Sequence, residues 1–390
     1  MNQRFYSLDI FRGATVALMI LVNNPGSWAH IYAPLEHAAW HGCTPTDLVF
    51  PFFLFAVGNA LAFVMPKMEA AGNAVFLQKV FKRAFLIFSI GLFMSWSPFV
   101  SWKDGQLAFR HWVNPGNPET GVRILGVLPR IALCYLFASL IIWYLKPRGA
   151  FVAAAVLLLT YWALCLLGNP ADPYSMNGWF GTGIDKKILG IAHMYKGEGI
   201  AFDPEGIMST LPAIAQVIFG YLAGNYILQK GKTYEMCTGL FVTAGILLFA
   251  GFCWHGVFPI NKKIWTSSFV LYTSGLAVFV LSMLIYLVEL KGYKAPAVTR
   301  FFDVFGKNPL FIFFLSGFLP RVLALLRWQD HTGPDGNPVY TSPLPWLYDH
   351  VFKNLSVNLN NGSLLYALFT VSFYWLIAWW MDRKKLYVKV

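Results

Sequence analysis

The chain has 390 residues, of which 57% are hydrophobic and 17% aromatic, while only 12% are charged. A soluble domain carries about 25% charged residues, so this composition excludes an ordinary soluble protein. The five cysteines show no CxxC or Cys/His spacing, so we expect neither a metal site nor a disulfide framework. The composition predicts a polytopic membrane protein.

Apolar runs long enough to cross a membrane follow one another along the chain. A spanning helix needs roughly 20 mostly apolar residues. We expect an all-α bundle of ten crossings, near residues 8–24, 46–65, 79–97, 122–145, 150–167, 207–228, 236–254, 265–288, 306–326 and 363–381. Residues 346–356 predict an interfacial amphipathic helix, because their apolar positions recur every four residues. With no internal repeat, one transmembrane domain over residues 1–390 suffices.

The basic residues predict the orientation in the membrane, because Lys and Arg favour cytoplasmic segments. With the N-terminus inside, the inner segments hold 17 basic and 6 acidic residues, and the outer ones hold 10 and 12. Both termini are therefore predicted to be cytoplasmic, and the net charge of +12 reflects topology rather than nucleic-acid binding. All eight histidines then fall outside, and the outer loops 98–121, 168–206 and 327–362 are expected to form a cap.

Residues 37–51 combine titratable side chains with the start of an apolar run. Thr44 is a predicted N-cap, and Asp47 lies near the positive end of the following helix, so we expect Asp47 to cap rather than to act as an acid. His37 and His41 precede the cap. Since histidine is the usual general base near neutral pH, His37 is the candidate catalytic residue and His41 its neighbour.

The first span is polar at both ends. Asp9 and Arg12 are three residues apart and share one helix face, whereas Asn23 lies about 21 Å further along the axis. These groups fit either a salt-bridged anchor with an amide cap or a functional site. Arg130, predicted to lie inside the fourth span, is harder to explain, because an intramembrane Arg marks function unless an acid from another helix pairs with it.

Two further polar groups lie next to predicted spans. Asp203 and Glu205 precede the sixth span, where they fit helix capping or recognition of a cationic amino group. Lys307 opens the predicted ninth span, where a helix N-terminus would suit a phosphate.

Several ordered motifs resemble the heparan-alpha-glucosaminide N-acetyltransferase family. The matching segments, by residue range, are SLDIFRG (7–13), VN (22–23), HAAWHGCTPTDLVFP (37–51), GVLPRIA (126–132), DPEGIMSTLPA (203–213), PINK (259–262) and WTSS (265–268). The resemblance implies a transmembrane acyltransferase that moves an acetyl group from cytosolic acetyl-CoA to the amine of a glucosamine-type sugar on the outer side.

The resemblance also suggests roles for individual residues. It implies that His37 acts as general base or acetyl carrier, with Asn23 assisting. The remaining assignments are Trp40, Asp203, Glu205 and Asn261 for the acceptor sugar, and Asp9, Arg12, Arg130, Lys307 and Ser267 for acetyl-CoA. No metal and no nucleic acid is expected.

The sequence leaves alternatives open. A secondary transporter of sugars or organic anions would also use an intramembrane Arg130 and an acidic outer mouth, and an acyltransferase of the same fold would act on another glycan. The chain lacks the extra N-terminal luminal region of the animal enzyme, so we expect a compact bacterial relative in the cytoplasmic membrane. The sequence does not decide which sugar is the acceptor. It also does not decide whether transfer is direct or passes through an acetyl-histidine intermediate, or whether the protein is a homodimer.

Overall fold

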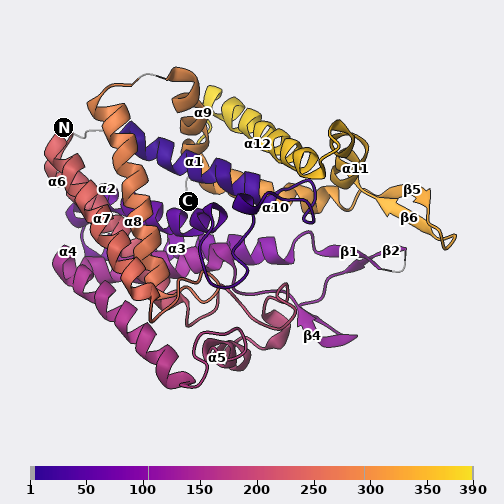
Figure 1. Ribbon diagram of the computed structural model, residues 1–390, viewed down its shortest axis with the longest axis horizontal. Coiled ribbons are helices and arrows are strands. Elements are labelled where there is room, and N and C mark those ends of the chain that lie inside the picture. Colours follow the sequence, from indigo (N-terminus) through magenta and orange to yellow (C-terminus); the bar gives the residue numbers. More distant parts are fainter. Residues whose placement is uncertain (1–4, 104, 294, 389–390) are drawn as a thin grey trace.

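Long helices pack side by side in the computed structural model, and short strands and helices gather at one end of them (Figure 1). The structure describes residues 5–103, 105–293 and 295–388, so Arg4, Lys294 and Lys389 of the topology count lie outside it. The long helices are α1 (Tyr6–Asn23), α2 (Val49–Ala71), α3 (Asn73–Trp96), α4 (Val127–Gly168), α6 (Thr210–Lys230), α7 (Tyr234–His255), α8 (Ser267–Leu284), α9 (Pro296–Lys307), α10 (Pro309–Leu323) and α12 (Leu359–Arg383). The predicted helical bundle is confirmed.

The number of crossings differs from the prediction. Within the described residues, seven helices are long and apolar enough to span a membrane, or eight if α9 and α10 form one broken span, so the count of ten is not confirmed. Two predicted spans lie within the 42-residue α4, which breaks at Lys146, where φ is 58°. Pro147 follows, and a residue before proline avoids the helical region. Helix α3 is not among the seven, and it carries Lys79, Lys82 and Arg83.

The predicted ninth span is bent. Helices α9 and α10 meet at 79° around Asn308, and Pro309 begins α10. Lys307 therefore lies in the last turn of α9, not at a helix N-terminus as predicted. A cation suits a helix C-terminus. The Lys307 Nζ lies 2.8 Å from an oxygen of Asp303 and 3.0 Å from one of Asp382 on α12.

Glycines bring two pairs of helices into backbone contact. A Cβ on Gly58 of α2 would lie 1.8 Å from the carbonyl oxygen of Val217 on α6, and one on Gly220 would lie 2.0 Å from that of Phe55. Gly13 of α1 meets α9 in the same way. Small residues at such crossings are typical of membrane helix packing. The α2–α6 contact matters for function because both helices continue into the polar loops at one end.

We call that end the cap end; it comprises residues 24–48, 97–126, 169–209, 256–266 and 324–358. It contains three antiparallel hairpins that the apolar pattern did not predict: β1 (Val100–Lys103) with β2 (Gln106–Phe109), β3 (Val113–Asn114) with β4 (Asn117–Gly121), and β5 (Trp328–Thr332) with β6 (Pro338–Thr341). It also contains α5 (Gly181–Ile188), η1 (Ala33–Leu35), η2 (Pro45–Leu48) and η3 (Ile191–His193), and α11 (Pro343–His350) with η5 (Phe352–Leu355) replaces the predicted amphipathic helix.

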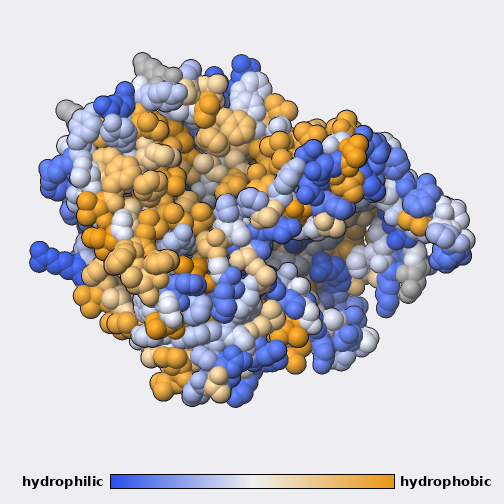
Figure 2. All heavy atoms as spheres, in the orientation of Figure 1, coloured by the Kyte–Doolittle hydropathy of each residue, from blue (hydrophilic) through white to orange (hydrophobic). Residues whose placement is uncertain are grey.

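The loops of the cap end contact one another, as predicted. The Arg327 guanidinium lies over the Trp102 ring, 4.5 Å from its centre, and the Lys196 Nζ donates to the Glu119 carbonyl at 2.6 Å. Figure 2 shows hydrophilic residues around the hairpins and a broad hydrophobic face over α4, α7 and α8. Phe249 and Phe252 of α7 belong to the exposed apolar side chains, as expected of lipid-facing helices.

Candidate functional site

The start of α2 holds His37 against a buried carboxylate. Asp47 closes the predicted capping box: its Oδ2 accepts from the amides of Thr44 at 3.0 Å and Ala38 at 3.1 Å. Its other oxygen, Oδ1, lies 2.7 Å from Nδ1 of His37. Asp47 is 1% exposed and His37 is 47% exposed, so a fixed anion orients an accessible imidazole. The predicted cap is confirmed, and the same carboxylate has a second role.

Lys262 completes this group from a loop far away in the sequence. Its Nζ lies 3.0 Å from Nδ1 of His37 and 3.3 Å from Oδ1 of Asp47. Burial lowers the pKa of Lys262, although Asp47 and Glu205 oppose the shift. Sequence analysis did not assign Lys262 a role; the one signal was its place in the PINK segment, residues 259–262.

Asn261 links the two loops that carry this group. Its fully buried side chain accepts from the Ile264 amide at 3.1 Å, and its Nδ2 lies 3.4 Å from Nδ1 of His41. The Gly42 amide, at φ +113°, donates to the Ile260 carbonyl at 2.8 Å. Burial, followed by the nearby His255, lowers the pKa of His41. His41 thus contacts Asn261, the residue next to Lys262, and lies in a more structural setting than His37.

A second charged group surrounds Arg123, which sequence analysis missed. Its guanidinium donates to Asp203 at 2.5 and 3.0 Å and also contacts Glu205. Burial raises the pKa of Asp203 against the opposing effect of Arg123. In Glu205, burial is outweighed by Arg123 and Arg130, so its pKa falls. Asp203 is fully buried, whereas the Glu205 side chain is 12% exposed, so Glu205 is the more accessible acid.

Arg130 lies at the cap end of α4 rather than deep in a span. Because α4 begins at Val127, Arg130 occupies its first turn, fully buried. Its guanidinium donates to the Gly206 carbonyl at 3.1 Å and to the Ser209 hydroxyl, and it lies 5.1 Å from the centre of the Trp265 ring. Arg130 is thus held by the segment that carries Asp203 and Glu205.

The remaining predicted residues of the cap end are spread around this site. The Trp40 indole donates to the Tyr174 carbonyl at 2.8 Å and its ring packs against Phe202 at 5.6 Å. The buried Ser267 hydroxyl donates to the Leu158 carbonyl at 2.8 Å. Asn23 is exposed at the end of α1, and within the described residues it makes no hydrogen bond to His37.

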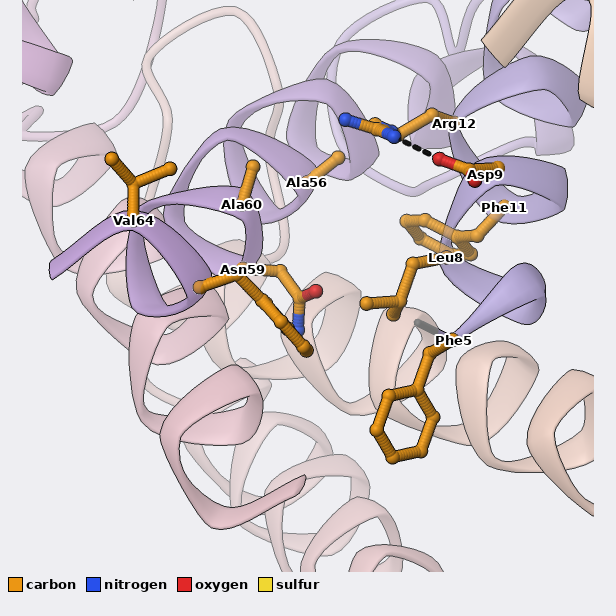
Figure 3. A pocket seen from close by; sticks show the side chains of 10 residues that line it. Phe5, Leu8, Asp9, Phe11, Arg12, Ala56, Asn59, Ala60 and Val64 are labelled. Atoms are coloured by element: carbon orange, nitrogen blue, oxygen red, sulfur yellow. Dashed lines mark hydrogen bonds and ion pairs between the residues drawn. The ribbon is translucent and has the colours of Figure 1, made fainter. Parts of the chain in front are cut away.

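The opposite end of α1, which we call the N-terminal end, borders two adjoining cavities. Asp9 pairs with Arg12 as the spacing predicted (Figure 3). One cavity, of about 260 Å³, lies between the start of α1 and the middle of α2. The other, of about 110 Å³, extends towards α3, α4 and α10. The two cavities share Arg12, Ala56 and Ala60 in their walls, so they lie on either side of the same residues.

Fold and site together define a multi-pass helical membrane protein with an oriented histidine at one end and an arginine-lined cavity at the other. Residues 4–251 match the family described as "Heparan-alpha-glucosaminide N-acetyltransferase, catalytic", and the chain belongs to this family. The resemblance seen in the motifs is therefore confirmed. Asn261, Lys262, Ser267 and Lys307 lie beyond the matched range.

Two relatives carry the same family name. The chain is 28% identical over 348 residues to the human heparan-alpha-glucosaminide N-acetyltransferase. This alignment covers 74% of this chain and 49% of the human relative. It is 25% identical to the mouse protein of that name over 437 residues, covering 96% of this chain and 60% of the relative. The chain thus spans about half to three-fifths of the length of these relatives.

Proposed function

We propose that the protein transfers an acetyl group from acetyl-CoA to the amine of a glucosamine-type sugar, with the donor entering from the cytoplasm and the acceptor from the outer side. The observation that carries the proposal is the contact of 2.7 Å between the accessible His37 and the buried Asp47. A His–carboxylate pair is the usual arrangement for proton transfer in acyl transfer.

Asp47 determines which nitrogen of His37 does the chemistry. Because Oδ1 of Asp47 can only accept, we assign the ring proton of His37 to Nδ1, which leaves the lone pair on Nε2. In direct transfer, Nε2 removes a proton as the sugar nitrogen bonds to the thioester carbon. The C–S bond then breaks, and the thiolate of CoA takes up that proton. In the two-step route, Nε2 itself attacks the thioester carbon, and the C–S bond breaks to release the thiolate of CoA. The sugar amine then attacks the acetyl carbon, the bond from that carbon to Nε2 breaks, and the amine proton passes to the thiolate.

Positive charge next to His37 would stabilise the oxyanion of the tetrahedral intermediate. Lys262 lies within 3.4 Å of both ring nitrogens of His37, so its ammonium group is close to the position where the negative charge of the oxyanion would develop. The Asn23 amide is the second donor in this proposal. Glu205, Trp40 and Asn261 border the acceptor side, with Glu205 the acid best placed to meet the sugar's amino group.

The N-terminal end fits the donor. Its cavity combines apolar walls with the Arg12 guanidinium, whose buried Nε has no hydrogen-bond partner within the described residues. Asp9 and Arg12 would border the CoA nucleotide, and Arg130 would stabilise the far end of the route. Ser267 and Lys307 already bond to Leu158 and to Asp303 and Asp382, so they support these helices in the proposal. The excess of basic residues in the segments at this end supports a cytoplasmic location in the proposal, as in a bacterial inner membrane.

Purified protein in proteoliposomes tests the proposal. With acetyl-CoA supplied on the side of the N-terminal end, glucosamine should cause release of free CoA thiol, measured with a thiol reagent. N-acetylglucosamine, whose amine is blocked, should cause none. Exchange of labelled glucosamine across the membrane without acetyl-CoA, and no thiol release with it, would overturn the proposal in favour of a transporter.

A further inference from the structure

Arg83 on α3 is a half-buried cation that no part of the proposed chemistry uses. Its guanidinium lies over the Tyr135 ring, 4.9 Å from the ring centre. Within the described residues it forms no ion pair with a carboxylate, and its buried Nε has no hydrogen-bond partner. By contrast, the neighbouring Lys79 and Lys82 are exposed.

Arg83 and Arg12 line the same cavity from different helices. The cavity of about 110 Å³ is bordered by Arg12 on α1 and Arg83 on α3, and its other lining residues are all uncharged. The Nε of Arg12 is also buried without a partner, although another of its nitrogens pairs with Asp9. Two guanidinium groups therefore border one apolar space, and within the described residues only that of Arg12 forms an ion pair, with Asp9.

An unpaired Arg next to apolar walls costs free energy, because its charge loses water without gaining a partner. A bound anion with two adjacent negative groups would remove that cost, since guanidinium groups match phosphate oxygens in geometry and charge. We propose that Arg83, together with Arg12, binds the diphosphate of the CoA donor. This inference rests on the proposed function for the identity of the ligand.

The apolar part of the cavity fits the rest of the donor. Beyond the two arginines it runs along Phe53 of α2 and along Leu128 and Ile131, which flank Arg130 on α4. Phe53 is six residues from Asp47, roughly 9 Å along the helix axis. The apolar wall thus leads from the two arginines that would bind the diphosphate towards His37, which is the direction that the pantetheine arm must take.

The test compares Arg83→Gln with Lys82→Gln, which removes an exposed cation from the same helix. Calorimetry in detergent measures the Kd of CoA and of pantetheine, which lacks the diphosphate. We expect Arg83→Gln to raise the Kd of CoA at least tenfold while changing that of pantetheine less than twofold, and Lys82→Gln to change neither. Arg83→Lys keeps the positive charge but lacks the planar guanidinium with its paired N–H donors, so it should raise the Kd of CoA by an intermediate amount.

Three outcomes would overturn the inference: an unchanged Kd of CoA in a folded Arg83→Gln protein, an equal loss for CoA and pantetheine, or no binding of CoA by the wild type. Should Arg83→Gln fail to fold, the same comparison applies to Arg83→Lys. Normal acetyl transfer with an unchanged Kd of CoA in the variant rejects the role of Arg83 alone. CoA binding that depends on Arg83 without any acetyl transfer rejects the proposed function and supports the role of Arg83.

Discussion

The two polar regions of the molecule differ in how their charges are matched. At the cap end, Asp47 contacts Lys262, and Asp203 and Glu205 both contact Arg123. At the N-terminal end, Arg12 pairs with Asp9, whereas Arg83, which lines the same cavity as Arg12, forms no ion pair within the described residues. A matched network holds its side chains in one arrangement, which suits chemistry on a bound sugar. An excess of cations over acids suits the binding of an anion that arrives from solution.

The largest effect is expected for His37→Ala, which removes the proposed base from the matched end. Turnover should fall by about 10²–10⁴, the usual contribution of general base catalysis. His331→Ala, in the exposed β5–β6 hairpin, is the matched control and should retain turnover. CoA binding should survive both changes, since it depends on the other end. A folded His37→Ala protein with full turnover would refute the assignment.

Arg123→Gln should have the next largest effect, on stability. It would leave Asp203 and Glu205 buried without their cation, and removing one partner of a buried ion pair costs about 3–5 kcal/mol. Chemical denaturation in detergent micelles measures the loss, and Lys196→Gln, an exposed cation of the same cap, should change little. Since protonation neutralises Asp203 and Glu205, the loss of unfolding free energy should be smaller at acidic pH. A loss below about 1 kcal/mol would contradict the matched network.

Asp47→Asn separates the two roles of this carboxylate. The amide still accepts hydrogen bonds from the helix start, but it no longer provides the anion that orients His37. We expect turnover to fall by about 10² or more, as when a catalytic histidine loses its carboxylate. Thr44→Val removes the hydroxyl that contacts Asp47 at 3.1 Å and the Glu36 carbonyl at 2.6 Å, but it keeps the carboxylate beside His37, so it should lower the melting temperature and leave turnover nearly unchanged. Equal losses of turnover in both variants would mean that Asp47 only caps the helix and does not orient His37 for catalysis.

The smallest effect concerns Asp185 of α5, which accepts from the Ile207 amide at 2.9 Å. Burial raises the pKa of Asp185 to about 7, with Asp203 adding to the shift and the Ile207 amide and Arg130 opposing it. Because the folded pKa lies above the unfolded value, this group stabilises the fold below about pH 4, and that contribution is lost as the pH rises to about 7.

Asp185→Asn should therefore match the wild type near pH 4 and melt a few degrees higher at pH 8. Melting temperatures between pH 4 and pH 8 measure the difference, with the exposed Asp349→Asn as the control. Parallel pH profiles for Asp185→Asn and the wild type would contradict the raised pKa.

Local features of the chain were predictable from the sequence. The capping box at Thr44 and the pairing of Asp9 with Arg12 depend on residues three apart, and most helices follow apolar runs of membrane-spanning length. The break at Lys146 within one long helix and the bend at Asn308 within one predicted span were not predicted, because apolar runs do not show how two helical segments are joined.

The partners of the candidate residues were decided only by the tertiary structure. Lys262 reaches His37 across 225 residues, Arg123 reaches Asp203 across 80, and Arg83 faces Arg12 from another helix. Helix periodicity and caps act over one or two turns, so they determine where a helix starts and which face is apolar. Which charges then meet depends on how the helices cross and the loops close, and that depends on packing across the whole bundle.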